Sequence, residues 1–101
     1  GTANNKRKNI SSYDRNKYSN SLYLRFEVKD KPGVLSEITK KLAIFKISIE
    51  RLIQIPDKQN KKATIVIITH KTNEKNSSKC LKIFKKNRNI LRTPTLIRLF
   101  S

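Results

Sequence analysis

The feature that most constrains the fold of this chain is a strictly alternating stretch that leads straight into a proline–glycine turn. In SLYLRFEV every second side chain is apolar: Leu22, Leu24, Phe26 and Val28. A period of two predicts a strand with one buried face and one polar face. The rest of the chain has to supply the layer that covers the buried face.

The remaining elements follow in a regular order. Apolar positions recur at helical spacing over 34–45 and again over 73–87, where lysines occupy the opposite arc, so both stretches are predicted to be amphipathic helices. β-Branched runs at 47–55, 63–70 and 95–100 predict three more strands. The order βαββαβ predicts a ferredoxin-like α+β sandwich, in which one antiparallel four-stranded sheet carries both helices on one face.

The predicted strand over 63–70 is apolar on both sides of the pleat. Ile65 and Ile67 point to one face, and Val66 and Ile68 point to the other. This pattern is typical of a central strand that is covered on both faces.

Residues 1–20 are polar and basic and have no apolar period, so we interpret them as a linker or disordered arm and assign 21–101 to the folded domain. The chain begins with Gly1 and contains no methionine, which we interpret as a piece of a longer polypeptide. No membrane span or signal peptide is evident, which predicts a soluble, cytoplasmic domain without a membrane partner. The single cysteine, Cys80, has no partner at metal-ligand spacing, so no metal site is predicted.

The formal net charge of +17 favours anionic partners at first sight. The excess of lysine, however, accompanies many isoleucines and asparagines: 17 Lys, 13 Ile and 10 Asn among 101 residues. A/T-rich codons would supply this composition throughout a proteome, and the charges are spread along the chain. We therefore interpret the charge as compositional and do not expect a nucleic-acid partner.

The turn at Pro32 and Gly33 is the first candidate site. Pro32 fits the first turn of a helix, and Gly33 has no Cβ to screen the backbone, so the helix start would present amide donors and a partial positive charge to a carboxylate. Asp30, just upstream, can accept from an ammonium group, and a free amino acid carries both groups. The alternative is a plain strand-to-helix turn that Asp30 caps.

The elements also carry a family resemblance. The stretches LYLRFEVKDKPGVLSEITKKLA, ISIERLIQI, ATIVIITHKTNE and TPTLIRLF, in this order over 21–101, resemble an ACT domain, and specifically the C-terminal ACT domain of homoserine dehydrogenases. The resemblance implies an amino-acid site where the first strand meets the first helix, often across a dimer interface. By position it implies ligand-binding roles for residues on the turn and on the facing second strand: Asp30, Gly33, Val34, Leu35, Ser48 and Ile49.

The resemblance implies a regulatory and assembly-forming role in a longer enzyme that interconverts homoserine and aspartate semialdehyde with NAD or NADP, on the route to threonine and methionine. The stretch itself holds no Gly-rich nucleotide loop and no acid–base pair, so we expect it to be non-catalytic and without a cofactor of its own. The implied partners are threonine as feedback ligand, a second copy of the chain through the sheet, and the catalytic domain of the parent chain. The serine-sensing relatives carry imidazole and amide groups where this chain has Val28, Asp30 and Ser48, which argues against serine.

Two positions depart from the family pattern. Lys46 stands where relatives have a helix-ending glycine, and a left-handed conformation there would cost on the order of 1 kcal/mol. Arg51 falls on the inward register of the second strand, so either a bulge turns it outward or it meets an acidic partner such as Glu50 or Glu27 of a neighbouring subunit.

Two alternatives stay open. An ACT fold that binds no ligand and serves only assembly would share every element above. An RNA-recognition fold has the same βαββαβ order and would place Tyr23 to stack on a base. Its third strand should carry exposed aromatic residues after a basic–glycine start, whereas KATIVIIT has neither.

Overall fold

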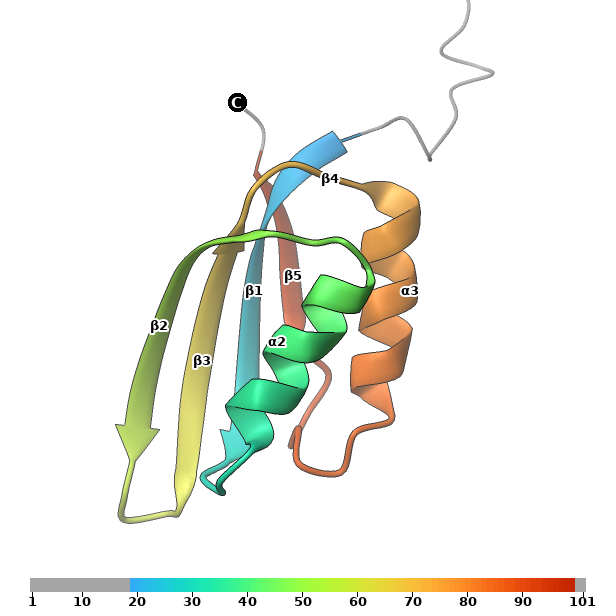
Figure 1. The fold of residues 1–101 in the computed structure, drawn as a ribbon. Helices are drawn as coiled ribbons and strands as arrows, with labels where there is room; N and C mark the ends of the chain where they lie inside the picture. The colour runs from blue at the N-terminus through green and yellow to red at the C-terminus, as the bar shows by residue number, and fades with distance from the viewer. Residues whose placement is uncertain (1–18, 100–101) are drawn as a thin grey trace, which may run out of the picture.

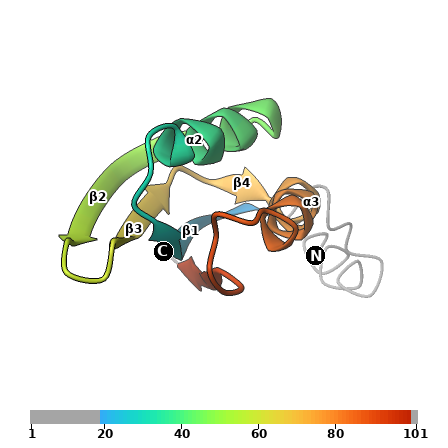
Figure 2. The same ribbon diagram turned by 90° about the horizontal axis from the view of Figure 1, so that it is seen from below.

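The computed structural model describes residues 19–99, in which one antiparallel sheet carries two helices on the same face (Figures 1 and 2). The elements in chain order are β1 (Ser19–Lys29), α2 (Val34–Ile44), β2 (Ile49–Asp57), β3 (Lys62–Thr69), β4 (Thr72–Asn73), α3 (Glu74–Lys85) and β5 (Thr95–Leu99). β1 pairs with β3 on one side, and β3 pairs with β2. On its other side β1 pairs with β5 and, at its start, with the short β4. The predicted ferredoxin-like α+β sandwich is confirmed.

The start of the sheet differs from the sequence-based expectation. β1 begins at Ser19, and Asn20 pairs with Thr72 of β4, a two-residue strand that the sequence pattern did not indicate. The predicted arm over residues 1–20 otherwise lies outside the described residues.

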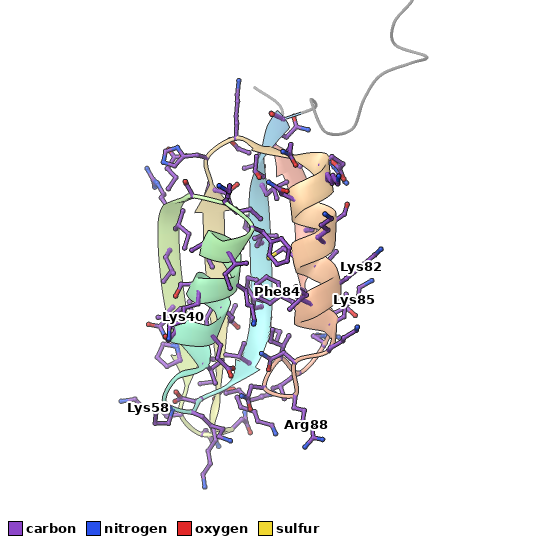
Figure 3. All side chains as sticks on the ribbon, turned by 45° about the vertical axis from the view of Figure 1, so that its right-hand side comes forward. Lys40, Lys58, Lys82, Phe84, Lys85 and Arg88 are labelled. Carbon is purple, nitrogen blue, oxygen red and sulfur yellow. The ribbon has the colours of Figure 1, made fainter. Side chains whose placement is uncertain are left out.

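The core lies between the sheet and the two helices. The alternation of β1 buries the predicted four side chains, and α2 buries Val34, Ile38 and Leu42 against them. From α3, Phe84 points toward the sheet (Figure 3) and meets Phe26 edge-on with ring centroids 5.0 Å apart. Cys80 of α3 is also buried, and burial raises the pKa of its thiol to about 12, so it behaves as a small apolar residue.

The second face of the sheet is open in the single chain. Both helices lie on the other face, so Val66 and Ile68 of β3 are only half-buried. On the same open face Ile53 is 51% and Ile97 is 49% exposed. The expectation that the strand at 63–70 is covered on both faces is therefore wrong for one chain, because no element of residues 19–99 packs on this side.

Both departures from the family pattern are resolved by the backbone. The ladder between β2 and β3 shifts register between Ile49 and Arg51, and this bulge turns Arg51 to the exposed side, which confirms the first of the two explanations given above. Lys46 adopts the left-handed region with φ 59°, as the helix-ending position requires. The amide N–H of Ile47 donates to the carbonyl of Leu42 at 2.9 Å, and that of Lys46 donates to the carbonyl of Ala43 at 2.9 Å, which is the Schellman pattern of helix termination.

Candidate functional site at the β1–α2 turn

The turn between β1 and α2 depends on the conformational freedom of its glycine. Gly33 is the N-cap of α2 with φ 89°, a left-handed conformation that residues with a Cβ rarely adopt. Its missing Cβ faces open space, since a Cβ built there meets no atom within 4 Å. Pro32 lies before the helix instead of in its first turn, because Val34 is the first helical residue.

No side chain caps this helix. Asp30 is exposed, and the helix start has no side-chain hydrogen bond, so the alternative in which Asp30 caps a plain turn is wrong. The backbone N–H of Asp30 donates to the carbonyl of Lys61 at 3.0 Å, which fixes the backbone of the turn against the β2–β3 hairpin. The carboxylate of Asp30 makes no hydrogen bond within residues 19–99 and is left free at the surface.

The first turn of α2 leaves backbone donors without partners. The N–H of Val34 donates to the carbonyl of Lys31 at 3.3 Å, and that of Glu37 donates to the carbonyl of Gly33 at 2.9 Å. Between them, the N–H groups of Leu35 and Ser36 reach no acceptor in the described part of the chain. Unpaired amides at a helix start combine hydrogen-bond donors with the positive end of the helix dipole and suit a small anion.

A shallow, open hollow, here called the turn hollow, lies beside these donors. Its lining comes from the turn, from one face of α2 and from the loop after α3: Lys31, Pro32, Gly33, Ser36, Glu37, Lys40 and Asn89. Figure 3 shows Lys40 projecting from α2. The Glu37 carboxylate accepts from the side-chain amides of Asn87 and Asn89 at 3.3 and 3.4 Å and so ties α2 to that loop. Two lysines against one paired carboxylate leave the hollow positive.

The structure brings together only part of the predicted site. Gly33 lines the turn hollow, and Asp30 lies exposed next to it. Val34 is buried in the core and Leu35 packs against it, so these two can meet a ligand only through their backbone. Ser48, which is exposed, and Ile49, which is half-buried, lie beyond the far end of α2. An 11-residue helix is about 16 Å long, so the two halves of the predicted site do not meet within one chain.

Some lining residues were not predicted from the sequence. Ser36 and Lys40 follow Gly33 at intervals of three and four residues, and helical spacing alone places them on the face that Gly33 starts. Asn89 comes from a loop more than fifty residues downstream, and no local pattern indicates its position.

The described residues, 19–99, contain no group of three His, Cys, Asp or Glu side chains that could hold a metal ion. None of the helices in this range is long and apolar enough to cross a membrane.

Comparison with known proteins adds to this geometry. Residues 22–89 match the family model of the ACT domain. Homoserine dehydrogenase of Helicobacter pylori (strain ATCC 700392 / 26695) is 39% identical over 77 residues, which are 76% of this chain and 18% of that enzyme. A crystal structure of a homoserine dehydrogenase from Thiobacillus denitrificans superimposes with a TM-score of 0.76 and 28% identity over 88% of this chain and 19% of its own.

The ACT domain from GTP pyrophosphokinase of Chlorobium tepidum has the same fold, with a TM-score of 0.62, 16% identity, and coverage of 81% of this chain and 100% of that domain. The chain spans less than a fifth of the length of the homoserine dehydrogenases that it matches, namely 18% and 19%.

Proposed function

This chain belongs to the ACT domain family, and on that premise we propose that it is the regulatory, amino-acid-binding domain of a homoserine dehydrogenase. The parent enzyme would interconvert homoserine and aspartate semialdehyde with NAD or NADP bound to its catalytic domain. Threonine would be the feedback ligand of the domain described here. The cytoplasmic location expected from the sequence stays a prediction.

The observation that carries this proposal is that the β1–α2 turn offers both hydrogen-bond donors and a free carboxylate acceptor. The unpaired N–H groups of Leu35 and Ser36 can donate to a ligand carboxylate, and the free carboxylate of Asp30 can accept from its ammonium group. A free α-amino acid carries these two groups on one carbon. The glycine at the helix start supports the proposal because no side chain covers the amides at that point.

The separation of the two predicted half-sites supports a two-fold dimer. β2 is the edge strand of the sheet, since within residues 19–99 it pairs only with β3. Antiparallel pairing of two β2 edges about a two-fold axis would continue the sheet through both copies. In Figure 1 α2 starts at the lower end of the molecule and β2 starts at the upper end, so the rotation would bring Ser48 and Ile49 of one copy beside the turn of the other.

Ligand choice is tested by thermal shift and calorimetric titration of the chain with threonine, serine, isoleucine, methionine and lysine. We expect threonine to raise the melting temperature and Asp30→Ala to weaken its binding at least tenfold, because the ammonium group loses its charged acceptor. Asp57→Ala is the matched control, since the Asp57 carboxylate accepts from Asn60 within the β2–β3 hairpin and does not line the turn hollow. If the chain is dimeric and no amino acid shifts its melting temperature, the domain serves only assembly and the proposal of an amino-acid sensor is wrong.

The shared site is tested by mixing two defective variants. Asp30→Ala damages the turn half, and Ser48→Arg blocks the strand half at an exposed position. If each site combines halves from two copies, a heterodimer of the variants holds one intact site, and random mixing restores about a quarter of the sites. If the mixture binds no better than either variant alone, both halves belong to one chain and the two-fold arrangement is wrong.

A further inference from the structure

A second polar hollow lies on the open face of the sheet, away from the helices. It is lined by two residues of β1 and three residues at the entry to β5: Arg25, Glu27, Arg92, Thr93 and Thr95. Arg25 and Thr95 are direct partners in the β1–β5 ladder, so both belong to the face opposite the buried Leu24. We call this the arginine hollow. The proposed amino-acid site shares no residue with it.

Hydrogen bonds fix one wall of the arginine hollow. The Arg25 Nε donates to Glu27 Oε2 at 2.9 Å, and the Thr64 hydroxyl donates to Glu27 Oε1 at 2.7 Å. The N–H of Leu91 donates to the backbone carbonyl of Glu27 at 2.8 Å, which holds the loop carrying Arg92 against the end of β1. A guanidinium group that is already oriented loses less side-chain entropy when it binds a ligand.

Several donors of the arginine hollow have no acceptor in the described part of the chain. Arg25 donates its Nε to Glu27, and Tyr23 is a second hydrogen-bond partner of its side chain. The guanidinium of Arg92 and the hydroxyls of Thr93 and Thr95 make no hydrogen bond within residues 19–99. Two guanidinium groups face a single carboxylate, so the hollow carries a net positive charge.

We propose that the arginine hollow binds a phosphate-type oxyanion, either free phosphate or the phosphate group of a small metabolite. A tetrahedral dianion can accept from two guanidinium groups and two hydroxyls at once, which is the set of donors present here. A planar carboxylate has two oxygen atoms and would leave part of this set unpaired. Glu27 faces the hollow but is occupied on both oxygens, and its role is to hold Arg25 in place.

The test is a titration of the 101-residue chain with inorganic phosphate, followed by backbone amide shifts in ¹H–¹⁵N spectra at constant ionic strength. A chain of charge +17 attracts anions everywhere, so sodium chloride has to replace phosphate at each step. We expect saturable shifts at Thr93 and Thr95. Shifts that do not saturate, or that centre on the start of α2, would overturn the proposal.

Two arginine variants distinguish a site from general charge attraction. Arg92→Ala should weaken phosphate binding about tenfold or more, because a charge-assisted contact is lost. Arg88→Ala removes the same charge from the same connection, but Arg88 lies outside the arginine hollow and is exposed (Figure 3), so its effect should stay below about twofold. Equal losses in the two variants would refute the site.

A third variant and two further ligands complete the test. Thr95→Val keeps the charge and the strand propensity but removes one hydroxyl, and it should weaken binding severalfold. Glycerol 3-phosphate should bind if the source is a phosphomonoester, and only inorganic phosphate should bind if the source is free phosphate. Succinate that binds as tightly as either would overturn the assignment to phosphate chemistry.

Discussion

At the scale of single residues, Glu27 is the most constrained charged side chain on the open face. The hydrogen bond from the Thr64 hydroxyl is the main cause that lowers the pKa of Glu27, and the Arg25 guanidinium contributes in the same direction. A carboxyl whose pKa is lower in the folded state stabilises the fold above its unfolded pKa, and this stabilisation is lost as the pH falls through the folded pKa.

Thr64→Val should therefore lower the free energy of unfolding in a pH-dependent way. At pH 7 we expect a loss of about 1 kcal/mol, since a partly buried carboxylate loses a neutral donor. As the pH falls through the lowered pKa of Glu27, the difference from the parent chain should shrink, because the carboxyl becomes protonated in both proteins. Urea unfolding at pH 7 and at a series of acidic pH values measures the effect.

Thr93→Val serves as the control for this prediction, because the exposed Thr93 donates to no carboxylate in the described chain. Its free energy of unfolding should stay within about 0.5 kcal/mol of the parent over the same pH range. A Thr64→Val difference that does not shrink toward acidic pH would contradict the role assigned to Glu27.

At the scale of elements, each end of α2 has a residue in the left-handed region, but the residue types differ. The start places glycine at φ 89°, where the conformation costs little. The end places Lys46 at φ 59° inside a Schellman pattern, where a side chain with a Cβ is strained. Gly33 leaves the amide N–H groups of the candidate site uncovered. Lys46 lies at the opposite end of α2 and ends the helix.

Lys46→Gly should stabilise the domain by about 1 kcal/mol, because glycine adopts the left-handed region without strain. Lys40→Gly is the matched control: it makes the same chemical change at an exposed position inside α2 and should destabilise by about 1 kcal/mol. Thermal unfolding of both variants would show opposite shifts in melting temperature. Two downward shifts would mean that Lys46 is not strained.

At the scale of the whole molecule, the β2–β3 hairpin carries isoleucines on both faces of the sheet, and these differ in burial. Ile67 of β3 is fully buried under the helices, whereas Ile53 of β2 is 51% exposed on the open face. The open face continues across the sheet to Ile97 and Leu99 of β5, which are 49% and 38% exposed. Apolar exposure of this extent is typical of a surface that another protein segment covers.

Ile67→Ala should cost about 3 kcal/mol of unfolding free energy, because it leaves a cavity in the core. Ile53→Ala makes the same chemical change on the neighbouring strand, where Ile53 pairs with Val66 on the opposite face of the sheet, and should cost less than about 1 kcal/mol in the monomer. Urea unfolding at low chain concentration gives both values. A large loss for Ile53→Ala that grows with chain concentration would mean that a second copy covers the open face.

The sequence by itself determined the order of the two helices and the four longer strands, the faces of β1 and both helices, and the exposed backbone at Gly33. These depend on local periodicity and on the steric limits of single residues, so they can be read along the chain. The tertiary structure alone decided that Ser48 and Ile49 lie a helix length from the turn, that Asn89 joins the turn hollow, and that Arg25 and Arg92 share a second hollow. These depend on which segments fold side by side, and a contact between residues distant in sequence leaves no local pattern.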